Sequence, residues 1–457
     1  MSTDRGGLDR SRLGSNYFKL FSASTISNLG DGIGVIAYPW LASAVTRNPL
    51  LIAIVAVVQR LPWLVFSLPA GVITDRHDRR RLMIGANAAR AVLTTIVAFA
   101  VLARQGSLPG PDVVADADTF ITTDVGLYLL VVAATLLLGM AEVIYDNSAQ
   151  TFMPSIVHPD NLEKANGRLW STEQVANTFA GPPLAALLIA VAYSLPFFVD
   201  ATTFIVSAVL ITLIPLRPRA DGPSPSRQPW KVELAEGFRW LWHHDLLRAL
   251  AITLGLLNLL GTWSTATLVL FGQEVLGTSA LEFAVLSTGG AIGGVASGWV
   301  ASAVARRLGE GPSLSLTLIG GGAATIVIGL VSWWPLAWVM FAAMMFTAVL
   351  WNVITVSFRQ RVIPDHLLGR VNSVYRFFGW GMMPIGAALG GLSVVIGELF
   401  VSREWALRLP WLISGALSIA LMVYAGPRLT TARFAAARAA ADPDPQPLGA
   451  TVATPDG

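Results

Sequence analysis

Apolar stretches of about 20 residues recur along most of this chain, and they constrain its fold more than any other feature. Each stretch is long enough to cross about 30 Å of hydrocarbon as an α-helix. Unbroken runs of this kind do not fit a membrane β-barrel, whose strands alternate apolar and polar residues. We therefore predict twelve membrane-spanning helices, at 17–45, 50–73, 82–103, 125–147, 174–193, 195–216, 247–271, 280–304, 312–332, 334–356, 371–397 and 405–426.

The composition also indicates a helical membrane protein. Of the 457 residues, 54% are hydrophobic and only 13% are charged, whereas soluble domains carry about 25% charged residues. The chain contains no cysteine, which excludes disulfides, thiol catalysis and cysteine-ligated metals. We expect no metal and no cofactor. The predicted fold class is an all-α polytopic membrane protein with two pseudo-symmetric six-helix bundles.

Basic residues are distributed unevenly between the two predicted sides of the membrane. With both termini inside, 25 of the 31 lysines and arginines lie in cytoplasmic segments and four in outer loops. This asymmetry follows the positive-inside rule, so the net charge of +3 does not indicate a nucleic-acid partner. We predict a multi-pass protein of the cell (cytoplasmic) membrane, surrounded by the lipid bilayer, with both termini cytoplasmic.

The longest polar stretch predicted to lie inside, residues 217–248, divides the helices six plus six. Its first half is rich in Pro, Ser and Arg, as flexible linkers are. Its second half suits an interfacial amphipathic helix, because apolar side chains recur there at helical spacing, at Trp230, Leu234, Phe238, Leu241 and Trp242. The predicted units are a cytoplasmic segment at 1–16, a bundle at 17–216, the linker with its interfacial helix at 217–246, a second bundle at 247–427 and a disordered cytoplasmic tail at 428–457.

The two halves are similar to each other in sequence. QTFMPSIVHPDNLEKANGRLW at 150–170 and QRVIPDHLLGRVNSVYRFFGW at 360–380 share a series of Gln, Pro, Asp, Leu and Asn. Further along, GPPLAA at 181–186 corresponds to GAALGG at 386–391. An internal repeat in a chain of this kind is typical of transporters whose binding site lies between two halves.

The predicted loop between the second and third helices carries GVITDRHDRRRLMI, residues 71–84. It resembles the cytoplasmic loop signature of the major facilitator superfamily, G-x-x-x-D-R-x-G-R-[RK]. The matching residues are Gly71, Asp75, Arg76, Arg79 and Arg80. Asp78 replaces the second glycine of the signature, and in the second half GWVASAVARR, at 298–307, has Ser302 in place of the aspartate. The resemblance implies a loop that gates the cytoplasmic face; the alternative is a plain topogenic signal made by the arginines.

NLGDGIGVIAYPWLAS, FFVDATTFIVSA and ELAEGFRWLWHHDLLR further resemble the multidrug, macrolide and enterobactin exporters of this superfamily. This resemblance covers nearly the whole chain except the tails, and it implies two bundles that rock about a central cavity. The fifth helix keeps the Gly181–Pro182 pair of such exporters, with Ala185 and Ala186 in place of a usual glycine pair. A packing kink without a role in export is the alternative for this pair, since proline bends a spanning helix.

A carboxylate, Asp31, lies inside the first predicted helix. Counting from the inner helix ends at about 1.5 Å per residue places Asp31 and Arg60 at similar depths, roughly 20 Å. An unpaired ion at mid-membrane costs at least about 2.5–3.5 kcal/mol. We therefore predict that Asp31 and Arg60 form a pair that couples transport to protons, with a closed structural pair as the alternative. The same counting predicts a structural pair between Arg90 and Glu142, and it leaves the role of Asp200 open.

The superfamily fold is expected to place the ligand cavity among helices 1, 4, 7 and 10. The predicted lining residues are Asn258, Thr262, Trp263 and Asn352. Amide and aromatic groups in a mostly apolar cavity suit a bulky amphiphilic molecule. The glycines beside Asp31 are expected to leave its face open to water or ligand; they are Gly30, Gly32 and Gly34.

The residues and the resemblance together predict a secondary active transporter that exports amphiphilic, drug-like or antibiotic-like small molecules by alternating access. We expect it to be a monomeric proton antiporter. The sequence has no HExxH, GxSxG or P-loop motif, so neither enzyme activity nor ATP hydrolysis is expected. One alternative keeps the fold but exports an endogenous metabolite such as a siderophore. Another is a membrane sensor that transports nothing.

Overall fold

The computed structural model describes residues 13–114, 121–158, 161–215 and 230–441, and the regular structure within these ranges is helical throughout. The first half comprises α1 (Ser15–Val45), α2 (Pro49–Val65), α3 (Ser67–Arg76), α4 (Arg79–Arg104), α5 (Pro111–Val114), α6 (Val125–Ile156), α7 (Leu162–Gln174), the π-helix η2 (Val175–Ala180), α8 (Gly181–Val191) and α9 (Leu195–Thr212). The second half comprises α10 (Trp230–His243), α11 (Asp245–Thr265), α12 (Leu268–Leu270), the π-helix η3 (Phe271–Val275), α13 (Ala280–Leu308), α14 (Glu310–Leu330), α15 (Trp334–Val362), α16 (Asp365–Gly397), α17 (Arg403–Ala425) and α18 (Thr431–Ala441).

Ten helical segments of the described chain are long and apolar enough to cross a membrane. The 31-residue α1 and the α2–α3 segment are consistent with two further spans, at the positions predicted for helices 1 and 2. α2 ends at Val65 with Pro62 in its last turn, and α3 begins at Ser67. Proline removes a backbone donor and disturbs the preceding turn. The predicted fold class, an all-α polytopic membrane protein, is confirmed.

Side-chain caps fix several helix starts. The Asn48 side chain accepts a hydrogen bond from the backbone N–H of Leu50 at 2.9 Å, and α2 begins at the next residue after Asn48. Asp124 caps α6 in the same way. Ser279 and Glu282 form a reciprocal capping box at the start of α13. Each cap satisfies N–H groups that lack a partner within the first helical turn.

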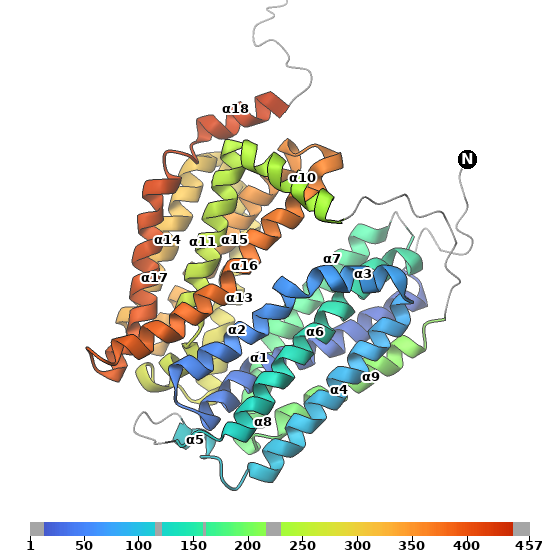
Figure 1. Ribbon diagram of the computed structural model, residues 1–457, viewed down its shortest axis with the longest axis vertical. Helices are drawn as coiled ribbons and strands as arrows, with labels where there is room; N and C mark the ends of the chain where they lie inside the picture. The colour runs from blue at the N-terminus through green and yellow to red at the C-terminus, as the bar shows by residue number, and fades with distance from the viewer. Residues whose placement is uncertain (1–12, 115–120, 159–160, 216–229, 442–457) are drawn as a thin grey trace, which may run out of the picture.

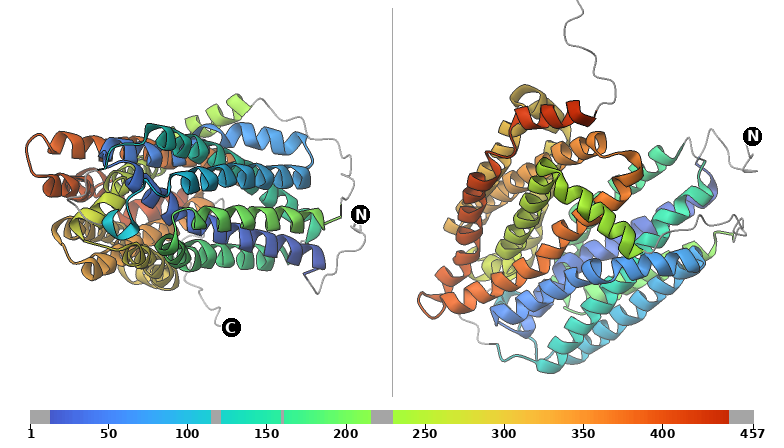
Figure 2. Two further views of the ribbon diagram at one scale, coloured as in Figure 1. Left: turned by 90° about the horizontal axis from the view of Figure 1, so that it is seen from below. Right: turned by 45° about the horizontal axis from the view of Figure 1, so that its top comes forward.

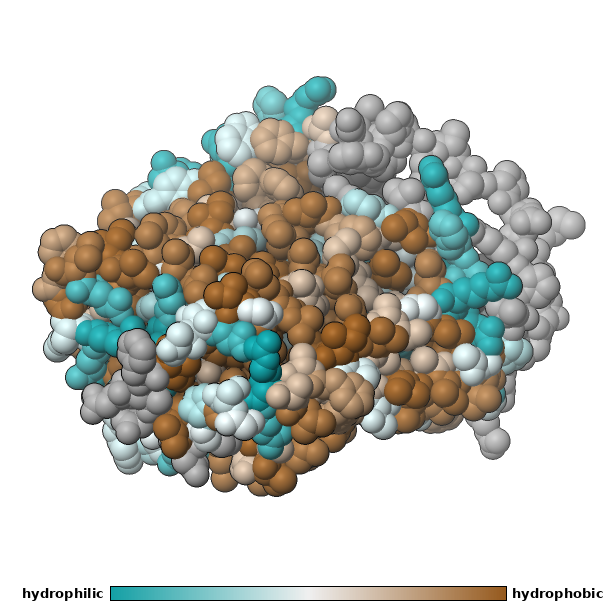
Figure 3. Space-filling model, turned by 60° about the horizontal axis from the view of Figure 1, so that its bottom comes forward, coloured by the Kyte–Doolittle hydropathy of each residue, from teal (hydrophilic) through white to brown (hydrophobic). Residues whose placement is uncertain are grey.

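The helices form two bundles that meet at one end and diverge toward the other (Figure 1). α16 packs along α2, and α13 packs against α8, so these four helices join the halves. The diverging end carries α3 and α7 of the first bundle and α10 and α18 of the second, as Figure 2 also shows. Apolar side chains dominate the middle of the surface in Figure 3, as expected for a face in contact with lipid.

The structure agrees with the helix predicted in the linker but not with the disorder predicted for the tail. The predicted helix in the second half of the linker is present as α10, with Leu241 buried and Phe238 and Trp242 each 42% exposed. The predicted disorder of the whole tail is wrong, because residues 431–441 form α18, whose Phe434 is fully buried. An alanine-rich stretch with one buried aromatic can pack as a helix where a neighbouring surface accepts that side chain. Residues 1–12, 217–229 and 442–457, and the side chains of Trp230 and Leu234, lie outside the described residues.

α1 and α8 cross with their backbones in contact, because two glycines meet at the crossing. A Cβ atom added to Gly181 would lie 2.5 Å from Gly32 Cα and 2.4 Å from its carbonyl carbon. Small residues allow such an approach between membrane helices. The Gly32–Gly181 crossing therefore sets the distance between these two walls of the molecule.

We predict that Gly181→Ala lowers the free energy of unfolding by about 1–3 kcal/mol, because the added methyl group overlaps a neighbouring backbone. Gly85→Ala in α4 is the matched control: a Cβ there meets nothing within 4 Å. Replacing a helical glycine by alanine stabilises a helix by about 0.5–1 kcal/mol. Thermal unfolding in detergent measures both variants, and a Tm that rises for both would contradict the close crossing.

Candidate functional site

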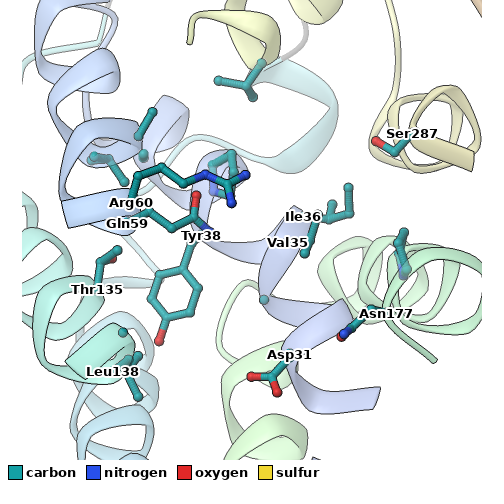
Figure 4. A pocket seen from close by; sticks show the side chains of 18 of the residues that line it. Asp31, Val35, Ile36, Tyr38, Gln59, Arg60, Thr135, Leu138, Asn177 and Ser287 are labelled. Atoms are coloured by element: carbon teal, nitrogen blue, oxygen red, sulfur yellow. The ribbon is translucent and has the colours of Figure 1, made fainter. Parts of the chain in front are cut away.

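A cavity of about 720 Å³ lies between the two bundles (Figure 4). α1, α2 and α6 supply most of its lining. The part that belongs to the second bundle consists of Thr265, Ala266, Leu268, Val269, Phe283 and Ser287. Ionisable side chains of five helices reach it; they are Asp31, Arg60, Arg90, Glu142 and Asp200. The site is therefore a shared cavity with several charges at membrane depth.

Asp31 of α1 and Arg90 of α4 form a salt bridge in the wall of this cavity. The Arg90 side chain is 3% exposed, whereas that of Asp31 is 26% exposed. Arg90 Nη1 also donates to Ser27 Oγ at 3.3 Å, and its guanidinium lies 3.9 Å from the centroid of the Phe204 ring, a cation–π contact. The arginine is thus held on several sides, while the carboxylate remains accessible from the cavity.

The predicted pairing of Asp31 with Arg60 is wrong. Arg60 projects into the cavity from α2 and lies apart from Asp31 (Figure 4), and Glu142 is the carboxylate within its electrostatic reach. Glu142 lies within electrostatic reach of both Arg60 and Arg90, so the predicted Arg90–Glu142 pair is replaced by a shared arrangement. Residue counting gives depth along a helix but neither the neighbouring helix nor the direction of a side chain. α1 packs mainly on α8 and α9, with little contact to α2.

The glycines beside Asp31 serve packing more than access. A Cβ on Gly30 would meet the side chains of Asp200 and Thr203 of α9 at 2.3 and 2.2 Å. Gly32 lies against the backbone of η2 and α8, and only Gly34 is among the residues that line the cavity. The expectation that all three leave the carboxylate open is therefore wrong for Gly30 and Gly32.

The site contains two carboxylates that the sequence analysis does not assign to it: Glu142, predicted to form a structural pair, and Asp200, whose role is left open. Asp200, 3% exposed, lines the cavity from α9, and Glu142 lines it from α6. With Asp31 they supply three carboxylates against the guanidinium groups of Arg60 and Arg90. The signal was present in the sequence, because an ionisable residue within a membrane helix is by default a functional candidate.

The fifth predicted helix changes from π-helical to α-helical at the Gly181–Pro182 pair. The π-helix η2 ends at Ala180, and α8 begins at Gly181 with Pro182 in its first turn. π-Helical turns are rare and frequent at functional sites. Pro182 and Asn177 line the cavity, and Asn177 Nδ2 donates to Asn28 Oδ1 at 3.0 Å. The π-helical turn before Gly181 and Pro182 is consistent with the kink predicted for this helix. A role of this pair in export stays a prediction.

The four predicted lining residues are not among the described residues that line this cavity. Asn258, Thr262 and Trp263 bond to α16: Asn258 Nδ2 donates to the Gly379 carbonyl at 2.9 Å, and Trp263 Nε1 donates to Ser393 Oγ at 3.1 Å. The Thr262 hydroxyl donates to a further α16 carbonyl at 2.9 Å. Polar groups in membrane helices often bond to a neighbouring helix.

Asn352 of α15 is exposed and bonds to its own helix, with Nδ2 3.2 Å from the Ala348 carbonyl oxygen. The prediction that α15, the tenth spanning helix, lines the ligand cavity is therefore wrong for the cavity described here. The first bundle supplies most of the polar lining. α11 contributes Thr265, two residues after Trp263.

The loop signature lies at the diverging end of the first bundle. Gly71 and the side chain of Asp75 are not described in the structure, and Arg76 is the exposed last residue of α3. Arg79 Nη1 donates to a backbone carbonyl of α6 at 2.6 Å, and Arg80 Nε donates to one of α9 at 3.1 Å. These bonds fix the start of α4 within its own bundle. The gating role of the loop stays a prediction.

At the end where the bundles meet, Glu274 of η3 joins the two halves. Its side chain is 3% exposed and pairs with Arg403 Nε at 2.5 Å and with Arg47 Nη1 at 3.4 Å. Arg403 Nη2 donates to the Arg47 carbonyl at 2.8 Å. Gln273 accepts from Arg47 at 2.7 Å and donates to Ser43 Oγ at 2.9 Å. These bonds tie the α1–α2 connection to η3 and α17.

Two helical bundles around a central cavity that contains ionisable side chains are typical of membrane transport proteins. The profile of the Major Facilitator Superfamily matches residues 20–387, and the chain belongs to this family. The "Multidrug efflux pump Tap" of Mycolicibacterium fortuitum is 26% identical over 424 residues, which cover 88% of this chain and 94% of that protein. The "Enterobactin exporter EntS" of Escherichia coli O1:K1 / APEC is 26% identical over 418 residues, covering 88% and 91%.

Solved structures of the same fold include other transporters. The nucleoside transporter NupG matches with a TM-score of 0.65 and 11% identity, covering 91% of this chain and 99% of that one. A bacterial homologue of the iron transporter ferroportin, in an inward-facing state, matches with a TM-score of 0.65 and 15% identity, covering 90% and 98%. These relatives and neighbours are transporters, not enzymes.

We predict that Asp31→Ala lowers the free energy of unfolding by about 3–5 kcal/mol, because it leaves the buried Arg90 without its partner. Adding Arg90→Leu removes the uncompensated charge and should restore most of this loss. Adding Arg60→Leu, the matched control, should restore little. Unfolding in detergent measures the three variants. Restoration by Arg60→Leu instead of Arg90→Leu would contradict the observed pairing.

Proposed function

We propose that this protein is a secondary active exporter of amphiphilic small molecules, drug-like or antibiotic-like, that works by alternating access. The observation that carries the proposal is the central cavity, because it is shared by both bundles and contains ionisable groups within largely apolar walls. Its volume of about 720 Å³ lies in the range that holds a drug-sized molecule. The relatives named as a multidrug efflux pump and an enterobactin exporter support the outward direction.

A second candidate cargo is an endogenous metabolite such as a siderophore. The similarity to an enterobactin exporter favours it, since that relative is as similar to this chain as the multidrug pump is. The proposal places the protein in the cell membrane as a monomer, with both termini cytoplasmic. The excess of lysine and arginine on that side supports this orientation.

Proton antiport is the proposed source of energy, with Asp31 as the group that binds the proton. Asp31 faces the cavity, and its partner Arg90 is buried. When Asp31 is protonated, Arg90 loses its main attraction and interacts more with Glu142 and Asp200, which are both within its electrostatic reach. In this proposal Arg60 still takes part in coupling transport to protons, but its partner is Glu142 and not Asp31. A proton therefore redistributes the charges that face the cargo.

Two sets of residues are proposed to close the cavity in turn. Arg47, Glu274 and Arg403 join the bundles at the end where they meet, which is the outer face in this proposal. The loop with Gly71, Asp75, Arg76, Arg79 and Arg80 is proposed to close the inner face when the outer ion pairs break. The π-helix before Gly181 and Pro182 supplies a place where the wall of the cavity bends.

In proteoliposomes with an imposed pH gradient, we predict that Asp31→Asn binds fluorescent amphiphiles but loses gradient-driven accumulation. The amide mimics the protonated carboxyl group and cannot release a proton. Asp245→Asn is the matched control, because the Asp245 side chain is 76% exposed at the start of α11. Accumulation by Asp31→Asn at the wild-type rate would show that the Asp31–Arg90 pair is only structural.

We predict that Glu274→Gln shifts the protein toward a state open to the outside, since it removes the carboxylate that joins Arg47 and Arg403. The chain has no cysteine, so a single Ser287→Cys in the cavity reports access. Its labelling from outside by an impermeant maleimide should rise about tenfold, because breaking a buried pair strongly biases a two-state equilibrium. Glu398→Gln is the control, because Glu398 pairs with Arg403 inside one bundle at 2.7 Å. Equal labelling in both variants would contradict the outer closure.

A further inference from the structure

A second cavity, of about 560 Å³, lies in the second bundle between α13, α15 and α18, separate from the central cavity. Its inner surface is largely apolar and includes Ala301, Val353 and Phe358. Four charged residues line it as well, and they are Arg306, Glu310, Arg361 and Arg438. Three guanidinium groups and one carboxylate thus surround an apolar space at the end of the molecule that carries α18 (Figure 1).

α18 is fixed over this cavity by specific contacts. Phe434 is fully buried, and its ring packs edge-on against Phe358 with centroids 4.6 Å apart. The backbone N–H of Gly311 donates to Thr431 Oγ1 at 3.2 Å, and Arg438 forms a salt bridge with Glu310. α18 therefore forms one wall of the cavity, which stays open to the surface at Arg306, Ser357 and Arg361.

The charges of this cavity are only partly balanced. Arg438 is neutralised by Glu310. Arg306 and Arg361 form no ion pair or hydrogen bond with any side chain of the described residues, although both line the same cavity and are exposed. Arg306 belongs to GWVASAVARR, the second-half counterpart of the loop signature. The transport cycle proposed above gives this segment no role. Two uncompensated guanidinium groups beside apolar walls fit an anion that carries a hydrocarbon chain.

We infer that this cavity binds an anionic membrane phospholipid, with its phosphate at Arg306 and Arg361 and an acyl chain along Val353 and Phe358. Guanidinium groups bind phosphate oxygens through strong, charge-assisted hydrogen bonds. Basic pockets between membrane helices on the cytoplasmic side bind anionic headgroups, and the cytoplasmic leaflet is rich in such lipids. The excess of arginine assigns this end of the bundle to that side. Inorganic phosphate could contact the arginines but would leave the apolar walls unused.

The test measures lipid binding to the full chain in neutral detergent by native mass spectrometry. The probes are phosphatidylglycerol, phosphatidylcholine and inorganic phosphate as a competitor. We expect saturable binding of phosphatidylglycerol, weakened roughly 25-fold in Arg306→Gln/Arg361→Gln, since each arginine contributes about a fivefold factor near an anionic lipid. Ser357→Trp keeps every charge but fills part of the cavity, and it should weaken binding as well. Ser357 is exposed and lines the cavity.

The matched control is Arg307→Gln/Arg433→Gln, which removes two exposed arginines that are not among the residues lining the cavity. It should bind phosphatidylglycerol within about twofold of the wild type. An equal loss in the control pair, unchanged binding in Arg306→Gln/Arg361→Gln, or equal affinity for phosphatidylcholine would overturn the proposal. Displacement of the lipid by inorganic phosphate at similar concentration, or normal binding by Ser357→Trp, would show a free-anion site instead.

Discussion

Ionic groups inside a membrane protein must be paired or wet, and this constraint organises the first bundle. The Arg90 guanidinium is buried at membrane depth, where its charge is costly unless it is compensated. Asp31, Ser27 and the Phe204 ring compensate it together. Because these partners come from α1 and α9, the arginine fixes the relative positions of three helices. Because a charged carboxylate must also be paired or hydrated, Asp31 lies at the wall of the central cavity.

The two bundles are joined at one end of the molecule and diverge at the other, with this charged cavity between them. Ion pairs of Glu274 hold the halves together at one end, while the bundles diverge at the other (Figure 1). The glycine crossing of α1 and α8 brings these two helices into backbone contact beside the cavity. The proposed rocking of two bundles requires each bundle to move as a unit and the ion pairs between them to break.

The two bundles use their polar residues differently. In the first bundle, charges gather around the central cavity. In the second, Asn258, Thr262 and Trp263 bond α11 to α16 and stabilise the bundle itself. The arginines of the second bundle lie at its end, around the cavity under α18. Under the proposed mechanism, the first bundle carries the groups that couple transport to protons, and the second bundle moves against it.

Hydropathy and helix caps determined the helical spans, because a segment in hydrocarbon must satisfy its backbone hydrogen bonds internally. The loop signature and the count of basic residues likewise pointed to the family and to an orientation. Only the tertiary structure decided that Asp31 pairs with Arg90 and that Arg60 lies near Glu142. Depth along a helix follows from residue number, but rotation about the axis and the choice of neighbour follow from packing. For the same reason Phe434 makes α18 part of the fold, although an alanine-rich tail carries no signal for the surface on which it docks.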